Sequence, residues 1–62
     1  METLVDERGA AAIIGCSVAL MRKWRRFGNG PQYCKLGRLV RYEKASIHAF
    51  LEAHRVETAG GR

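Results

Sequence analysis

The side chains with the clearest chemical use in this sequence are four cations within five residues: Arg22, Lys23, Arg25 and Arg26. Guanidinium and ammonium groups bind phosphate, and the planar fork of arginine also matches the O6 and N7 acceptors of guanine. A helix through this run would present positive charge over most of its exposed surface, because the four residues span little more than one turn. The chemistry this predicts is non-covalent recognition of a polyanion.

The positive charge is concentrated in one part of the chain. The 62 residues carry a net charge of +5, and the segment 22–44 alone carries +7 while the remainder carries −2. A surface that only has to stay dissolved mixes the two signs more evenly. The segment is therefore a candidate contact face for nucleic acid. Its eight basic residues are Arg22, Lys23, Arg25, Arg26, Lys35, Arg38, Arg41 and Lys44, against the single acid Glu43.

Chemistry other than binding has little support in the sequence. It contains no paired carboxylates, no nucleophile beside a base and no phosphate-binding loop, so we expect no enzymatic activity and no cofactor. Cys16 and Cys34 match no zinc spacing, and His48 and His54, six residues apart, fall on different faces of a helix. We expect no metal site. We expect the cysteines to be small, partly buried side chains in a reducing cytoplasm, and the histidines to face solvent.

Two short helices must position the cations. Asp6 is a good N-cap and Gly15 a good C-cap, which predicts a first helix between them. Ser17 caps a second helix that ends at Gly28, and only Cys16 separates the two helices, as in a helix-turn-helix. We expect one side of the second helix to pack on the first helix and its four cations to fan out over the rest. The packed side is predicted to be Met21, Trp24 and Phe27.

A β-hairpin is predicted after the second helix. The run Gly28-Asn29-Gly30-Pro31 breaks the helix, and two β-prone runs, 33–36 and 39–42, flank Gly37-Arg38. A two-residue loop with glycine first suits a type II′ turn. We expect Arg38 at the tip, Lys35 and Arg41 on one open face, and an opposite apolar face made by Cys34, Leu36, Val40 and Tyr42.

A last helix is predicted from about Glu43 to His54, and it closes the fold. We expect its apolar stripe of Ile47, Phe50 and Leu51 to pack against Trp24, Met21 and Ile13. The sequence thus predicts a single α+β domain over residues 1–62, mainly helical, of winged helix-turn-helix architecture, with residues 1–4 and 56–62 frayed. With no signal peptide and no apolar run near 20 residues, we expect a protein of the cytoplasm, associated with the nucleoid and not with a membrane.

The chain resembles a family along residues 5–54. It looks like the small excisionases and AlpA-type regulators of phages and integrated elements, which are winged helix-turn-helix proteins related to the DNA-binding domain of MerR regulators. The hairpin pattern Lys-x-Gly-Arg-x-Val-Arg-Tyr, residues 35–42, contributes most. The other matching residues are Glu7-Arg8-Gly9-Ala10-Ala11, Ile14-Gly15, Ser17, Met21, Arg22, Trp24, Arg25, Gly28, Gly30-Pro31, Tyr33 and the run from Ile47 to Leu51.

The resemblance implies that the second helix enters the major groove of double-stranded DNA and that the wing touches an adjacent groove or the backbone. It implies an architectural factor that bends DNA and directs an integrase, a recombinase, toward excision. The alternative within the family is an AlpA-like transcriptional regulator of a prophage or integrated element.

Separate roles are expected for the residues of the second helix and the wing. We expect Arg22 to contact bases, with Val18, Ala19 and Leu20 near base edges or backbone, and Lys23, Arg25 and Arg26 to bind phosphates. Ser17 caps the helix and is also able to contact a phosphate. Wing contacts are expected from Lys35, Arg38 and Arg41. Because one such module is small, we expect cooperative self-association on DNA or help from a partner protein.

Two other classes of function stay open. A basic domain of this size could bind RNA, although we expect it to lack exposed aromatic side chains that could stack on bases, because Trp24 and Phe50 are committed to the core. A protein-interaction module is the third possibility, and Leu20 on the second helix is its main support.

Overall fold

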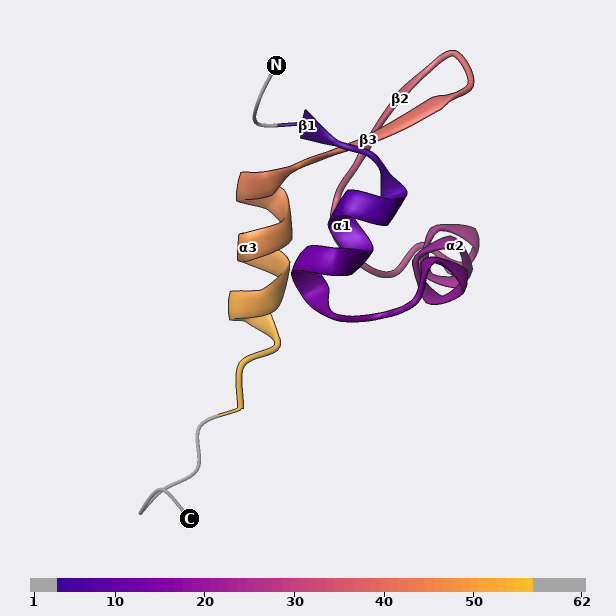
Figure 1. Cartoon of the computed structure of the whole chain (residues 1–62). Helices are drawn as coiled ribbons and strands as arrows, with labels where there is room; N and C mark the ends of the chain where they lie inside the picture. The colour runs from indigo at the N-terminus through magenta and orange to yellow at the C-terminus, as the bar shows by residue number, and fades with distance from the viewer. Residues whose placement is uncertain (1–3, 57–62) are drawn as a thin grey trace.

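The computed structural model describes residues 4–56 (Figure 1). Its three helices and one three-stranded antiparallel sheet confirm the α+β class predicted from the sequence. In chain order the elements are β1 (Leu4–Val5), α1 (Glu7–Ile14), α2 (Val18–Phe27), β2 (Cys34–Leu36), β3 (Leu39–Glu43) and α3 (Lys44–Ala53).

The helix boundaries follow the predicted caps. The Asp6 carboxylate accepts a hydrogen bond from the backbone N–H of Gly9 at 2.9 Å, and the Ser17 hydroxyl accepts one from Leu20 at 3.0 Å. Gly15 and Gly28 end α1 and α2 with φ values of 88° and 75°, a left-handed conformation that glycine adopts without a steric penalty. The short connection between α1 and α2 therefore has the form that the sequence predicted.

The hairpin also forms, but the predicted distribution of its side chains is wrong. Leu36 pairs with Leu39 across the two-residue turn, which places Lys35 opposite Val40 and Cys34 opposite Arg41. Residues directly opposite one another share a face of the sheet. Lys35 and Arg41 therefore lie on opposite faces, and no purely basic face exists.

Each face of the hairpin has its own character. Val40 and the buried Tyr42 face the helices, and the ring of Tyr33 lies 5.7 Å from that of Tyr42. The opposite face leaves Leu36, Leu39 and Cys34 exposed, so the expectation that Cys34 is partly buried is wrong.

Strand β1 was not predicted. Leu4 pairs with Glu43 and Val5 with Tyr42, which makes β3 the central strand in the order β1-β3-β2. Leu4 is therefore ordered in the sheet, contrary to the prediction that residues 1–4 fray. At the other end, Val56 lies beyond α3 and is exposed; residues 1–3 and 57–62, the remainder of the two predicted frayed ends, lie outside the described residues.

The core is small and draws on all three helices and β3. Its fully buried members are Ala10, Ala11, Met21, Tyr42 and Ile47. Two of the predicted packing stripes need correction, because Phe27 is 64% exposed and Ile13 and Leu51 are each 37% exposed. Trp24 packs as expected against Phe50 of α3, with ring centroids 5.3 Å apart.

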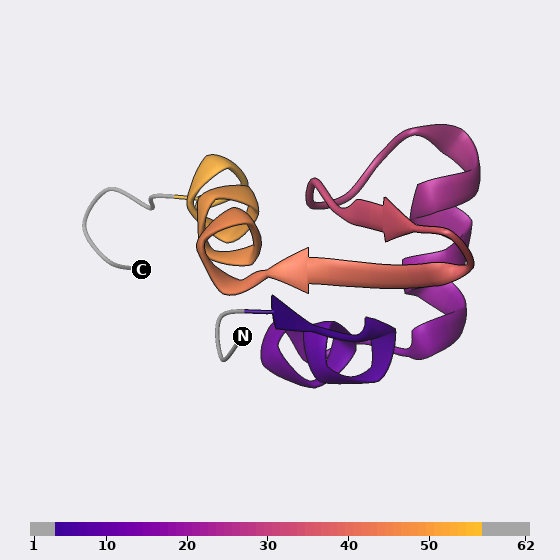
Figure 2. The same cartoon turned by 90° about the horizontal axis from the view of Figure 1, so that it is seen from above.

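The elements leave α2 and the hairpin on the same side of the molecule. In both views α2 and the tip of the β2–β3 hairpin lie on one side, and α3 lies on the other, with α1 between them (Figures 1 and 2). The basic segment 22–44 is thus folded back, so that its two cationic parts, α2 and the hairpin, lie on the same side of the molecule.

Candidate nucleic-acid interface

The outward surface of α2 is built around Ala19, Lys23 and Arg26. At 100° per residue these three lie opposite the buried Met21, and all three are exposed. Leu20, half-buried, and the exposed Phe27 form one edge of this surface, while Arg22 forms the edge nearest α1. This exposed surface therefore presents two cations, Lys23 and Arg26, with the small side chain of Ala19 between them.

Not every predicted contact residue faces outward. Val18 packs against the core, and the predicted outward fan of four cations is wrong for Arg25. The Arg25 side chain is only 21% exposed, and its Nη1 donates to the Tyr42 hydroxyl and to Glu7, each at 3.2 Å. Its position follows from the helix geometry, because Arg25 lies one turn after Met21 and on the same side. Arg25 therefore ties α2 to α1 and β3.

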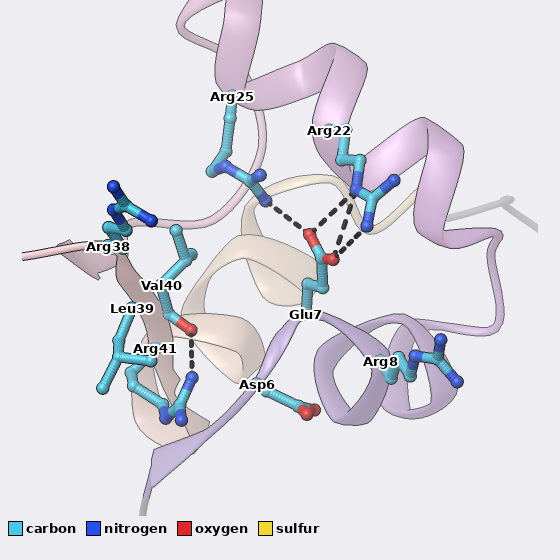
Figure 3. Close-up of a pocket in the computed structure, with 9 residues that line it drawn as sticks. All are labelled: Asp6, Glu7, Arg8, Arg22, Arg25, Arg38, Leu39, Val40 and Arg41. Carbon is cyan, nitrogen blue, oxygen red and sulfur yellow. Dashed lines mark hydrogen bonds and ion pairs between the residues drawn. The ribbon is translucent and has the colours of Figure 1, made fainter. Parts of the chain in front are cut away.

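Glu7, in the first turn of α1, joins two of the α2 arginines. Its carboxylate accepts from Arg22 Nη2 at 2.6 Å and from Arg22 Nε at 3.2 and 3.3 Å, and also from Arg25 (Figure 3). The Arg22 side chain is 63% exposed, whereas that of Glu7 is 21% exposed. The carboxylate is thus the inner, fixed member of the cluster, and Arg22 is its solvent-facing partner.

The cluster shifts the protonation equilibria of its members. The Arg22 hydrogen bonds, with a smaller contribution from Arg25, hold the pKa of Glu7 below its usual value of 4.5, against the opposing effect of burial. The bond to Tyr42 raises the pKa of Arg25, and the bond to Glu7 raises the pKa of Arg22. At neutral pH the three groups therefore form a fully ionised cluster.

A cleft of about 340 Å³ separates the start of α1 from α2 and β3 (Figure 3). Arg38 and Arg41 come from the hairpin side and Arg22 and Arg25 from α2, so cations line it from two elements. Arg8 adds a fifth arginine, and Asp6 and Glu7 are the only acids of the lining. Arg41 Nη1 donates to its neighbour's carbonyl, that of Val40, at 2.9 Å. The cleft is net positive and concave, which suits an anionic backbone.

The other two predicted hairpin cations are both accessible. Lys35 and Arg38 are both exposed. Arg38 lies in the two-residue turn after Gly37, which has a φ of 63°, and Arg38 itself has a negative φ because all positive φ values among the described residues belong to glycines. That combination fits the predicted type II′ turn. Arg38 therefore projects from the end of the hairpin.

The expectation that the chain lacks exposed aromatic side chains is wrong. Phe27 and Tyr33 are both exposed, and each has an arginine guanidinium 5.8 Å from its ring centroid, Arg26 over Phe27 and Arg25 over Tyr33. Trp24 and Phe50 do pack on one another, as expected.

The remaining candidates for chemistry lie apart from this surface. His48 is exposed on α3, and the ring of His54 lies tilted against that of Phe50, with centroids 4.3 Å apart and its Nδ1 2.8 Å from the Phe50 carbonyl oxygen. Both cysteines have free thiols, and Cys16 is half-buried as predicted. Within residues 4–56, no group of three or more histidine, cysteine or acidic side chains is placed to hold a metal ion.

Sequence analysis missed Glu7 and Tyr42 as members of the site. They lie 15 and 17 residues from their arginine partners, so no local spacing brings them together. The one available signal is Glu7 itself, an acid in the first turn of a helix that precedes a cationic helix, and that position also suits the helix dipole.

The chain matches no protein-family model and no curated protein sequence. Among the described residues, none of the helices has the length and apolar character needed to cross a membrane.

Proposed function

We propose that this chain binds double-stranded DNA in a sequence-specific manner as a winged helix-turn-helix protein, with α2 as the recognition helix and the β2–β3 hairpin as the wing. One observation supports this most directly: α2 and the turn of the β2–β3 hairpin lie on the same side of the molecule, away from α3 (Figure 2), and both elements carry exposed cations. Two acids, Asp6 and Glu7, line the cleft between α1, α2 and β3. Asp6 caps α1, and Glu7 is paired with arginines of α2.

The dimensions of α2 suit the major groove. Its 10 residues give a rod of about 15 Å with a diameter of about 10–12 Å, and the groove is about 12 Å wide. In this pose Ala19 lets the helix backbone approach the bases, and Lys23 and Arg26 reach the phosphates on either side. Arg38 at the wing tip contacts the adjacent minor groove or its phosphates.

The biological role that we propose is that of an excisionase-like architectural factor, which binds near a recombination site and directs an integrase toward excision. The support is the resemblance of residues 5–54 to excisionases and AlpA-type regulators. A change in the ratio of integrase products on adding the protein supports this role. A change in promoter output without integrase supports the alternative, transcriptional regulation.

The test of DNA binding is selection of bound duplexes from a random library, followed by titration of the selected duplex and a scrambled one. We expect one preferred motif, and amide chemical-shift changes confined to α2 and the hairpin when the selected duplex is added. Equal affinity for all duplexes, or shift changes gathered on α3, would overturn the proposal.

The exposure of Phe27 and Tyr33 favours one competing function, binding of single-stranded RNA through base stacking. A competition between single-stranded RNA and the selected duplex distinguishes the two functions. If RNA is the ligand, single-stranded RNA outcompetes the duplex, and Phe27→Ala weakens RNA binding about tenfold or more. If DNA is the ligand, the duplex wins the competition.

A further inference from the structure

The contact with Glu7 engages the Nε and Nη2 atoms of Arg22 and leaves Nη1 without a contact to Glu7. Arginine has five N–H donors, which form a side fork from Nε and Nη2 and an end fork from Nη1 and Nη2. Glu7 takes the side fork, through Nε and one N–H of Nη2. In Figure 3 the third nitrogen, Nη1, points away from Glu7.

The end fork is the pair of donors that matches guanine. Two parallel N–H groups reach O6 and N7 together, and this is the commonest base-specific contact in the major groove. Within residues 4–56, no hydrogen bond engages Nη1 of Arg22, and the side chain is exposed at the edge of the outward surface of α2. The free half of Arg22 is thus open to a ligand while the other half is held.

Glu7 is a firm support for Arg22. It sits in the first turn of α1, one residue after the cap formed by Asp6, and its other contact is the largely buried Arg25, which is itself held by Tyr42. A charge-assisted, two-pronged contact fixes the plane of a guanidinium group as well as its position. An arginine without such support rotates about several side-chain bonds, so it is able to turn toward a nearby phosphate and away from a base.

We infer that Glu7 is a specificity-determining positioning residue: it holds Arg22 so that the arginine contacts a guanine end-on, in place of a phosphate. The inference rests on the proposed function and adds the residue that decides base selection within it. Glu7 touches no DNA in this arrangement. Its negative charge opposes DNA binding overall, so it trades affinity for selectivity.

The experiment measures the preference for guanine, as the ratio of affinities for the selected duplex and a duplex changed at the Arg22-dependent base pair. Glu7→Gln should leave affinity for scrambled DNA unchanged or raised, because net charge rises by one, while the guanine preference falls about fivefold or more. Arg22→Lys, which keeps the charge but cannot form the fork, identifies the base pair and should abolish the preference there.

Glu52→Gln is the matched control. Glu52 is an exposed acid of α3 paired with Arg55 at 2.9 Å, and its loss changes the net charge equally on the opposite side of the molecule. We expect it to keep the guanine preference. Glu7→Asp is a second variant that keeps the charge but withdraws the carboxylate by one methylene, so a reduced preference there cannot come from net charge or from loss of the acid.

A double-mutant cycle separates positioning from folding. If Glu7 acts through Arg22, then Glu7→Gln has no further effect on base preference in the Arg22→Lys background. A general defect in folding would lower affinity for every duplex and leave the ratio intact. The inference is overturned if Glu7→Gln and Glu7→Asp keep the full guanine preference. Failure of the unsubstituted protein to select any sequence would instead overturn the proposed function.

Discussion

Arginines of equal charge have different uses along α2. Arg22 is divided between Glu7 and solvent, Arg25 is turned inward to Tyr42, and Arg26 stands free beside Phe27. Their angular positions decide this, because Arg25 follows the buried Met21 by one turn whereas Arg26 lies on the far side of the helix. Net charge alone therefore overstates the number of side chains available to DNA.

Arg25 and Arg26 provide a matched test of this division. We expect Arg25→Ala to lower the free energy of unfolding by about 1–3 kcal/mol, because it removes the charged donor to the Tyr42 hydroxyl and one of the two arginine partners of Glu7. Arg26→Ala should change stability by less than about 0.5 kcal/mol but reduce the salt dependence of DNA binding by about one phosphate contact. Urea denaturation and titrations at several salt concentrations measure the two effects. The opposite pattern would assign Arg25 to DNA.

Glu7 predicts an acid-dependent part of the stability. Its pKa is lowered in the folded protein by Arg22 and Arg25, so the carboxylate cluster stabilises the fold above the ordinary pKa of 4.5. The contribution is lost as the pH falls through the lowered pKa, because the folded state must then take up a proton. We expect the difference in melting temperature between the unsubstituted protein and Glu7→Gln to shrink toward zero below that pH. A difference that stays constant from pH 7 to pH 3 would contradict the ion pairs.

Local residues determine the helices and the turn, and this part of the fold was predictable. The caps at Asp6, Ser17, Gly15 and Gly28 act within three or four residues, so both ends of α1 and of α2 were visible in the sequence. The register of the hairpin was also implied by its two-residue loop, although the faces were assigned from alternation alone. Alternation within each strand does not say which residues of the two strands share a face.

Contacts between distant residues account for what the sequence did not show. Strand β1 has two residues, too few for any periodicity, and forms only because β3 offers an edge some 38 residues later, with Leu4 opposite Glu43 and Val5 opposite Tyr42. The Glu7–Arg22 contact depends in the same way on how α1 crosses α2. The exposure of Phe27 was predictable in principle, because it lies well away from Met21 around the helix even though it follows Trp24 by three residues.

The loop between α2 and β2 sets the position of the wing, and Gly30 is its tightest point. Gly30 has φ 85°, and a Cβ there would lie 2.9 Å from the Cβ of Trp24; Gly37 has φ 63° and open space around it. We expect Gly37→Ala to cost about 1–2 kcal/mol from backbone strain alone. Gly30→Ala should cost about 1–3 kcal/mol more, since it also displaces Trp24. Equal losses in chemical denaturation would show that the loop is loosely packed.

On the scale of the whole molecule, the exposed cations and the core lie on different faces of the same elements. The core is formed where the three helices meet β3, with Met21 and Tyr42 buried in it, whereas the exposed cations of α2 and the hairpin point away from it and these two elements lie on the side away from α3 (Figure 1). With about five phosphates neutralised, the logarithm of DNA affinity should fall against the logarithm of salt concentration with a slope of about −4 to −5. Fluorescence anisotropy across about 50–300 mM salt measures this slope, and a value near −1 would contradict the proposed surface.

One copy of so small a domain has limited contact with DNA. A single module buries only about 600–1,000 Å² of its surface, and α2 offers base contacts from no more than a few side chains. Useful selectivity then requires several copies on neighbouring sites or a partner protein. We expect a duplex with two adjacent sites to bind the second copy more tightly than the first, and a duplex with one site to discriminate poorly from scrambled DNA at physiological salt. Sedimentation and titration with one-site and two-site duplexes test this. Tight, selective binding of one copy to one site would show that the face described for α2 and the hairpin is incomplete.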